Sequence, residues 1–187
     1  MSKDTKEQQD LFKLLRDIEA KNISHNVIPA ADTDIKEEWS GVSFSTDDLH
    51  FVARMGDILE VLTYPELTRV PRSKSWVKGV ANVRGNLLPI MDLKNFLGGG
   101  RTNIHRRSRV LVIEHKDSVT GLLVDDSMGI KRFYTEERMS APDTIPDIYK
   151  PYVDGLFIEE VGLEDFKWNI FNIEKLIQEQ DFYRAAG

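Results

Sequence analysis

Two segments of the 187-residue sequence, 76 positions apart, share one pattern. Each begins with an aromatic residue, a valine, any residue and a glycine, starting at Trp76 in the first and at Tyr152 in the second. In both, this opens a β-rich run, which is followed by a turn, a second β-rich run and a residue that can cap a helix, Asp92 or Asn172. The repetition predicts two similar small β units, each a barrel-like closed sheet.

The segment from Trp76 to Leu97 sets out the first of these units. Its order of β-branched, turn-forming and capping residues predicts a hairpin, a helical turn and a stop. The predicted parts are a strand over Val77–Arg84, a turn at Gly85–Asn86, a strand over Leu87–Asp92, a helix over Leu93–Leu97 and a stop at Gly98–Gly100.

Asn82 and Arg84 are the unusual members of this hairpin, because they lie beside apolar residues. Polar groups in an apolar strand pair need hydrogen-bond partners or contact with water. The Arg84 guanidinium has five N–H donors in a fixed fork, so it can tie neighbouring loop carbonyls together. It can equally dock a partner, and the residues leave both roles open.

The remaining β-rich runs extend the pattern along the chain. Gly41–Ser45 and Leu49–Arg54 predict a hairpin, and Arg109–His115 and Val119–Val124 predict another. The run RVLVI at the start of the second hairpin is apolar without alternation, which is typical of a strand buried on both faces.

The composition changes near residue 38 and predicts two parts of the chain. In residues 1–38, Leu11, Leu14, Leu15 and Ile18 form one helical stripe, and a polar tether follows. Residues 39–187 hold the β units, with subdomain 1 at about 39–100 and subdomain 2 at about 101–187, and end in a helix over Ile173–Gln180. The sequence thus predicts a mainly β fold with an N-terminal and a C-terminal helix.

Composition narrows the class of protein further. The chain has no cysteine, a net charge of −6 and no apolar run near the ~20 residues that a membrane span needs. We therefore expect a cytoplasmic protein that neither inserts into membranes nor binds nucleic acid. The basic run Arg101–Arg109 is the exception; a solvated linker is the favoured interpretation, and a nucleic-acid or small-ligand module is the alternative.

The sequence lacks the patterns of an enzyme. Gly98–Gly100 does not have the spacing of a phosphate-binding loop, and the four histidines are scattered. Adjacent acidic pairs such as Asp125–Asp126 point to opposite faces of a strand and cannot share one substrate proton. We predict no catalytic activity, no metal site and no cofactor.

Four runs, in order, resemble the CheW-domain family of adaptors that join chemoreceptors to a CheA-type histidine kinase. They are ILEVL with LTRVP, VKGVANVRGNLLPIMDL, RVLVIEH with GLLVDD, and FNIEKLI. The resemblance covers about residues 39–177. In detail it is strongest to the family member of the chemosensory system that controls type IV pili and twitching motility, and a flagellar chemotaxis adaptor is the alternative.

The resemblance implies a fold and partners. The family fold is two five-stranded SH3-like barrels that face each other across a hydrophobic groove. Its members catalyse nothing; they bind the regulatory domain of the kinase and the cytoplasmic tip of a methyl-accepting chemoreceptor, and they are recruited to membrane-associated receptor arrays. A two-component system with an adaptor or scaffold of this kind is therefore the expected setting.

Matching positions give the expected contact residues. The kinase-binding residues are Ile58, Glu60, Val61, Leu62 and Gly79. The residues for receptor binding or bracing are Asn82, Arg84, Leu122, Leu123 and Val124. Two alternatives stand beside these expectations: Ile58 can be a core residue, and Gly79 can mark a strand bulge.

Overall fold

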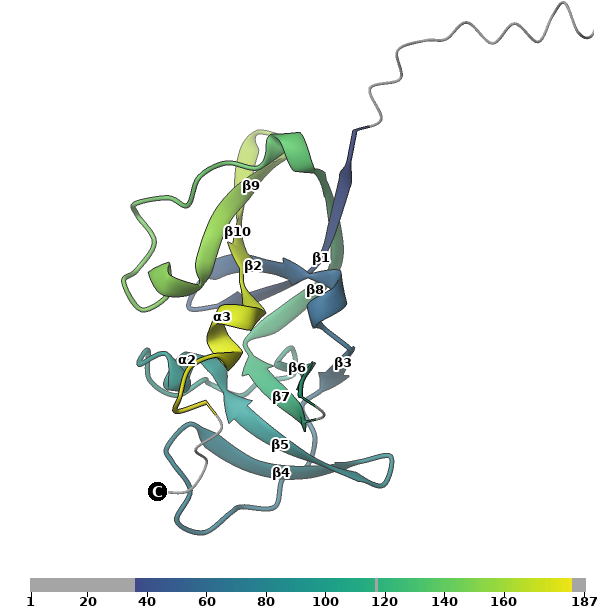
Figure 1. Cartoon of the computed structure of the whole chain (residues 1–187), viewed down its shortest axis with the longest axis vertical. Coiled ribbons are helices and arrows are strands. Elements are labelled where there is room, and N and C mark those ends of the chain that lie inside the picture. The colour runs from purple at the N-terminus through teal and green to yellow at the C-terminus, as the bar shows by residue number, and fades with distance from the viewer. Residues whose placement is uncertain (1–35, 117, 183–187) are drawn as a thin grey trace, which may run out of the picture. The chain divides into compact units, whose positions relative to one another are not determined.

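The computed structural model describes residues 36–116 and 118–182, which form ten strands in two five-stranded sheets (Figure 1). The N-terminal helix and tether expected in residues 1–35 lie outside the described residues. The strands are β1 Glu38–Thr46, β2 Leu49–Arg54, β3 Glu60–Thr63, β4 Val77–Val83, β5 Asn86–Asp92, β6 Arg109–His115, β7 Ser118–Val124, β8 Asp126–Tyr134, β9 Val153–Val161 and β10 Glu164–Phe171.

The helical segments are short. They are η1 Met55–Asp57, α2 Leu93–Phe96, η2 Thr135–Glu137, η3 Lys150–Tyr152 and α3 Ile173–Ile177. Within the part of the chain that the structure describes, no helix is long and apolar enough to cross a bilayer. The two α-helices begin where the sequence predicts, because the side chains of Asp92 and Asn172 accept hydrogen bonds from the amides of Asn95 and Lys175.

The two sheets exchange strands between the halves of the chain. Sheet A has the order β8-β1-β2-β10-β9, and sheet B has the order β3-β6-β7-β5-β4. Figure 1 shows sheet A above sheet B, with α2 and α3 near their junction. The predicted division at about residue 100 does not separate the sheets, because hairpin β1–β2 pairs with β8 and β10 rather than with β3–β5. The parallel pairs β2–β10 and β5–β7 insert each hairpin into its sheet.

Each sheet curls until a single bridge closes it. In sheet B, Thr68, beyond the end of β3, exchanges two backbone hydrogen bonds of 2.9 Å with Val80 of β4. In sheet A, Met139, beyond the end of β8, pairs in the same way with Leu156 of β9. Each bridge pairs one residue of an edge strand, Val80 of β4 or Leu156 of β9, and so shortens the open edge of that strand.

The repeat predicted from the sequence is present in detail. The ladder shifts register between Val77 and Gly79 in β4, and the equivalent shift lies opposite Val153 and Gly155 in β9. A Cβ on Gly79 would lie 2.5 Å from the Thr68 carbonyl oxygen, and one on Gly155 would lie 2.5 Å from that of Met139. Glycine is required where another backbone approaches this closely.

Apolar side chains fill three clusters. One lies inside each sheet, and the third, largest cluster joins the two sheets. Burial of both faces of β6 explains why its apolar residues do not alternate with polar ones. Val110 and Val112 pack inside sheet B, whereas Leu111 and Ile113 pack into the shared cluster. The prediction of a strand buried on both faces is confirmed.

The β4–β5 turn differs from the prediction by one residue. The strands end at Val83 and resume at Asn86, so the turn residues are Arg84 and Gly85, not Gly85 and Asn86. Both have positive φ, 51° and 87°. Such a pair suits the two-residue turn whose twist matches that of the flanking strands. Arg84 therefore lies in the turn rather than in a strand.

Candidate protein-binding surface

Arg84 and Glu60, predicted for different partners, contact each other. Arg84 Nη2 donates to Glu60 Oε1 at 2.6 Å, and Nη1 donates to Oε2 at 3.2 Å. The pair joins the β4–β5 turn to β3, across the line where sheet B closes on itself. Arg84 thus braces a carboxylate, not the loop carbonyls that the sequence suggested. Because Arg84 is exposed, the pair adds little stability and leaves both charges accessible.

Exposed apolar residues occur next to Glu60 in the chain and close to Arg84 in the β4–β5 hairpin. Leu59, which precedes β3, and Val61 on β3 are the chain neighbours of Glu60 and are 56% and 38% exposed, and Leu87 near the start of β5 is 77% exposed. On the extended strand, Leu59 and Val61 point to the face opposite that of Glu60. Together with Glu60 and Arg84 they make the β3 surface. Apolar anchors next to a charged rim are the composition of a protein contact site.

Of the predicted kinase-contact residues, Ile58 and Gly79 are buried and Leu62 is partly buried. Ile58 is 8% exposed and belongs to the cluster between the sheets. Leu62 packs against the cluster inside sheet B. Gly79 is buried against Thr68 at the register shift of β4. The core role of Ile58 and the bulge role of Gly79 are therefore the ones the structure supports.

Asn82 supports the turn that presents Arg84. Its Oδ1 accepts a hydrogen bond of 2.9 Å from the Gly85 amide, and the side chain is otherwise exposed. Asparagine favours this geometry because its carbonyl can mimic a backbone acceptor at a turn. Asn82 and Arg84 are thus the expected receptor-side residues that the structure brings together at the surface.

The structure places Leu122, Leu123 and Val124, which were expected for receptor binding or bracing, away from solvent. All three are fully buried: Leu122 and Val124 face the shared cluster, and Leu123 faces the inside of sheet B. They belong to β7, the middle strand of sheet B, so both faces of the strand are covered.

The next strand carries exposed apolar side chains instead. Met128 and Ile130 on β8 are exposed, and Ile130 lies opposite Val42 of β1 at the edge of the shared cluster. Val42 also pairs with Ala53 of β2. Met55, two residues after Ala53, is exposed. We call Met55, Met128 and Ile130 the β8 surface. The sequence signal was the alternation of Met128, Gly129 and Ile130, which marks one face of a strand.

Sheet A closes on itself with a counterpart of the Glu60–Arg84 pair. Lys131 Nζ of β8 donates to Glu159 of β9 at 2.7 and 2.8 Å, and Trp168 Nε1 donates to the same carboxylate at 2.8 Å. The hydrogen bond from Lys131 holds the pKa of Glu159 below its ordinary value; burial opposes this and the Trp168 bond reinforces it. The charges are reversed relative to sheet B, where the carboxylate is on the first edge strand.

The pattern of ten strands and two closed sheets is that of a known family. Residues 40–181 match the family model described as the CheW-like domain. The chain belongs to the CheW-like family. The family consists of non-catalytic adaptor and scaffold proteins, so the prediction that the chain is not an enzyme is confirmed.

Individual relatives agree with this assignment. The chain is 38% identical over 178 residues to Protein PilI of Pseudomonas aeruginosa, covering 95% of this chain and 97% of that protein. It is 31% identical over 146 residues to the chemotaxis protein CheW of Thermotoga maritima, covering 78% and 92%. The crystal structure of the scaffolding protein TtCheW from Thermoanaerobacter tengcongensis has a TM-score of 0.63 at 22% identity, over 76% of this chain and 89% of that one.

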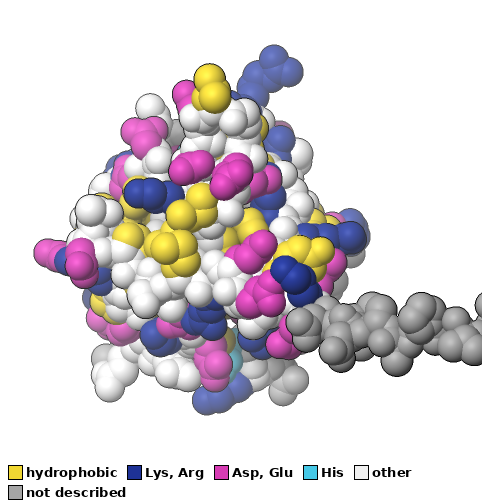
Figure 2. Space-filling model, turned by 90° about the horizontal axis from the view of Figure 1, so that it is seen from above, with side chains coloured by type: hydrophobic (Ala, Val, Ile, Leu, Met, Phe, Trp, Pro, Cys, Tyr) yellow, Lys and Arg dark blue, Asp and Glu magenta, His cyan; other side chains and the backbone are white. Residues whose placement is uncertain are grey.

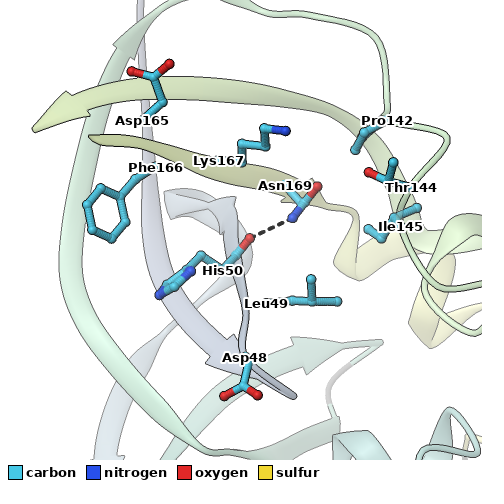
Figure 3. A pocket seen from close by; sticks show the side chains of 10 residues that line it. All are labelled: Asp48, Leu49, His50, Pro142, Thr144, Ile145, Asp165, Phe166, Lys167 and Asn169. Carbon is cyan, nitrogen blue, oxygen red and sulfur yellow. Dashed lines mark hydrogen bonds between the residues drawn. The ribbon is translucent and has the colours of Figure 1, made fainter. Parts of the chain in front are cut away.

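A pocket of about 310 Å³ in the CheW-like domain lies at the start of β2 and β10 (Figure 3). Asp48 and Asp165 lie at opposite ends of it, and the one hydrogen bond among the residues drawn runs from Asn169 Nδ2 to the His50 carbonyl at 2.9 Å. No two titratable groups that line this pocket are paired for proton transfer. Among the described residues, no group of three or more histidine or acidic side chains could hold a metal ion.

The basic run of the CheW-like domain is partly neutralised. Arg107 lies 3.5 Å from an Asp126 carboxylate oxygen, and Arg109 donates to the carbonyls of Arg106 and Ser108. Side chains that contact their own chain are less available for phosphates along a nucleic acid. The arrangement favours the linker interpretation over a nucleic-acid surface.

Apolar residues are exposed on sheet A as well. Figure 2, which looks down on this end of the CheW-like domain, shows apolar side chains among acidic and basic ones. The exposed apolar residues of strands β8–β10 and their connections are Tyr134, Met139, Ile158, Val161 and Leu163, in addition to Met128 and Ile130. The domain thus offers more than one surface for protein contacts.

Proposed function

We propose that the chain is an adaptor that couples the cytoplasmic tip of a methyl-accepting chemoreceptor to a CheA-type histidine kinase. The β3 surface is the observation that carries the proposal, because Leu59 and Val61 are exposed on either side of Glu60 in the chain and the Glu60–Arg84 pair is accessible. Of these residues, the family resemblance assigns Glu60 and Val61 to the kinase and Arg84 to receptor binding or bracing. The adaptor is recruited from the cytoplasm to membrane-associated receptor arrays.

On the kinase side, the β3 surface binds the regulatory domain. Leu59 and Val61 provide the apolar contact area, and Glu60 contributes at the rim, where a charge affects the association rate more than the lifetime of the complex. Ile58, Leu62 and Gly79 support this surface from inside the domain. They hold β3 and β4 in position without contacting the kinase.

On the receptor side, the β8 surface provides an apolar area that an amphipathic helical tip can bury. Met128 is unbranched and adapts to irregular surfaces, and Ile130 offers a rigid, branched contact. Asn82, which the family resemblance links to receptor coupling together with Arg84, shapes the turn that presents Arg84 within the β3 surface.

We assign the adaptor to the chemosensory system of type IV pili and twitching motility. The 38% identity to Protein PilI over nearly the whole of both chains supports this assignment. A flagellar chemotaxis adaptor is the second candidate, supported by the 31% identity to the chemotaxis protein CheW of Thermotoga maritima. The two candidates share the same domain and differ in partner.

Binding of the purified full chain to the regulatory domain of a CheA-type kinase tests the proposal. Val61→Asp should weaken binding at least about tenfold, because it places a carboxylate in an apolar contact. Val119→Asp is a matched control: Val119 is 39% exposed against 38% for Val61, but lies on β7, outside the β3 surface. Equal binding by both variants would contradict the role of the β3 surface. Kinases of the pilus and flagellar systems, compared side by side, distinguish the two pathways.

The receptor side needs a separate experiment. Ile130→Asp should reduce co-sedimentation with receptor-containing membranes while kinase binding persists, since β3 and β8 lie in different sheets. Ile158→Asp on β9 is the control, because Ile158 is exposed on sheet A but lies outside the β8 surface. Loss of sedimentation with both variants, or with neither, would argue against the β8 surface as the receptor site.

A further inference from the structure

A small pocket on sheet B gathers three positive charges and no acidic lining residue. It has a volume of about 230 Å³ and is formed by the β3–β4 connection, β4 and the segment after α2. Its lining residues are Arg69, Val70, Ser73, Ser75, Val77, Lys78 and Arg101. Such a concentration of positive charge stands out in a chain whose net charge is −6.

Two of the three charged groups of the pocket have no ion-pair partner in the described part of the chain, and the third, Lys78, has a distant one in Asp92. Arg69 and Arg101 form no ion pair with a described residue. Lys78 Nζ lies 3.8 Å from Asp92 Oδ2, which is beyond hydrogen-bonding distance. Guanidinium forks and an ammonium group with unfilled donor capacity are the groups that proteins use to bind oxyanions.

Backbone and side-chain hydrogen bonds fix the chain at or next to these three residues. Thr68, next to Arg69, is fixed by its two hydrogen bonds to Val80. Thr102, next to Arg101, donates its amide and its hydroxyl to Asp92 at 3.0 and 2.7 Å. Lys78 lies within β4. The backbone at each charged residue is therefore fixed before any ligand arrives, which lowers the entropy cost of binding.

The net charge of the pocket indicates which class of ligand it can bind. Asp92 is the carboxylate nearest Lys78, and it is fully buried and already accepts hydrogen bonds from Thr102 and Asn95. Three cations set against this one carboxylate leave two positive charges. A phosphate monoester carries nearly two negative charges at neutral pH and three acceptor oxygens, whereas a carboxylate carries one charge and two oxygens.

We propose that Arg69, Lys78 and Arg101 form a binding site for a phosphate monoester group. Arg69 and Arg101 bind its oxygens through their N–H forks, Lys78 adds a compact positive charge, and Ser75 lies at the pocket with its hydroxyl. The site is separate from the β3 and β8 surfaces, so it adds a ligand to the adaptor rather than a partner contact.

The test is an NMR titration of the ¹⁵N-labelled full chain with inorganic phosphate, at constant ionic strength kept with sodium chloride. Saturable shifts are expected at the amides of Val70, Ser75, Lys78 and Arg101. Arg69→Gln and Arg101→Gln should each raise the Kd roughly tenfold, because each removes a charge-assisted contact. Arg106→Gln removes an equal charge outside the pocket, at an exposed arginine of the same basic run, and should leave the Kd unchanged.

Two further comparisons complete the test. Binding of O-phosphoserine should strengthen as the pH rises through about 6, where a phosphate monoester gains its second charge. Adenosine 5′-monophosphate and O-phosphoserine then distinguish a nucleotide from a phosphorylated side chain, by which binds more tightly. Shifts that do not saturate, or that all three variants share equally, would overturn the proposal, since they would reflect general surface charge.

Discussion

Gly79 illustrates how a single residue can hold a closed sheet together. It has φ of +146°, and a Cβ there would lie 2.5 Å from the Thr68 carbonyl oxygen. We expect Gly79→Ala to lower the free energy of unfolding by at least about 2 kcal/mol, from backbone strain and the clash together. Urea denaturation measures this, with Gly56→Ala as the control, since Gly56 has open space around it. Equal stability of the two variants would contradict the close approach.

Ile58 supplies a second prediction, on the difference between core and contact residues. It is buried in the cluster between the sheets, whereas Val61 three positions later is exposed. Ile58→Ala should therefore cost about 2–4 kcal/mol of unfolding free energy, and Val61→Ala less than about 1 kcal/mol. Chemical denaturation of the two variants checks this. Wild-type stability of the Ile58→Ala variant would indicate that Ile58 is a contact residue and not a core residue.

These residues also mark what sequence reasoning could reach. Asp92 and Asn172 were predictable as helix caps because capping depends on a few neighbouring residues. The burial of Ile58, Leu122, Leu123 and Val124 was not, because an apolar side chain on a strand looks the same whether the facing surface is solvent or a second sheet. The ion-pair partner of Arg84 could not be predicted for a related reason: Glu60 is distant in sequence and is brought near Arg84 by closure of the sheet.

At the scale of elements, both sheets close through the same devices with opposite charges. A backbone bridge lies after the first edge strand in each, and an ion pair reinforces the junction: Glu60 with Arg84 in sheet B, and Lys131 with Glu159 in sheet A. The reversed polarity means that a strand of one sheet cannot make the matching ion pair in the other. Because both pairs are at least partly exposed, they contribute little to the choice of strand partner.

The junction in sheet A should make stability depend on pH. Because the pKa of Glu159 is lowered in the folded state, its ion pair contributes fully above the ordinary glutamate pKa of about 4.3 and is lost as the pH falls through the folded value. We expect a contribution of roughly 0.5–1 kcal/mol for this partly exposed pair.

Two variants isolate this contribution. Glu159→Gln removes the titrating group, and Lys131→Gln removes the hydrogen bond that lowers its pKa. Both should lose less stability than the wild type between about pH 6 and pH 3, measured by denaturation at each pH. Unchanged pH dependence in both variants would show that the pair does not act in this way.

At the scale of the whole molecule, the chain is a tandem repeat whose halves exchange hairpins. The repeat was predictable from the sequence, because the same strands, glycines and caps recur in order. The exchange of hairpins was not predictable from the sequence. Similarity between segments shows which parts correspond, but not whether a hairpin pairs within its own half of the chain or with the other half. Both arrangements bury the same apolar faces, and the choice depends on the length and path of the connections, such as η1 between β2 and β3.

The exchange predicts that neither half folds alone. A cut within the segment between α2 and β6 gives fragments 1–104 and 105–187; the first lacks β6 and β7 of sheet B, and the second lacks β1 and β2 of sheet A. Each fragment would also expose its side of the cluster that joins the sheets. We expect poorly dispersed NMR spectra and no cooperative unfolding for either fragment, and recovery of the native spectrum on mixing. A cooperative unfolding transition in one isolated fragment would mean that its hairpin can pair within its own half.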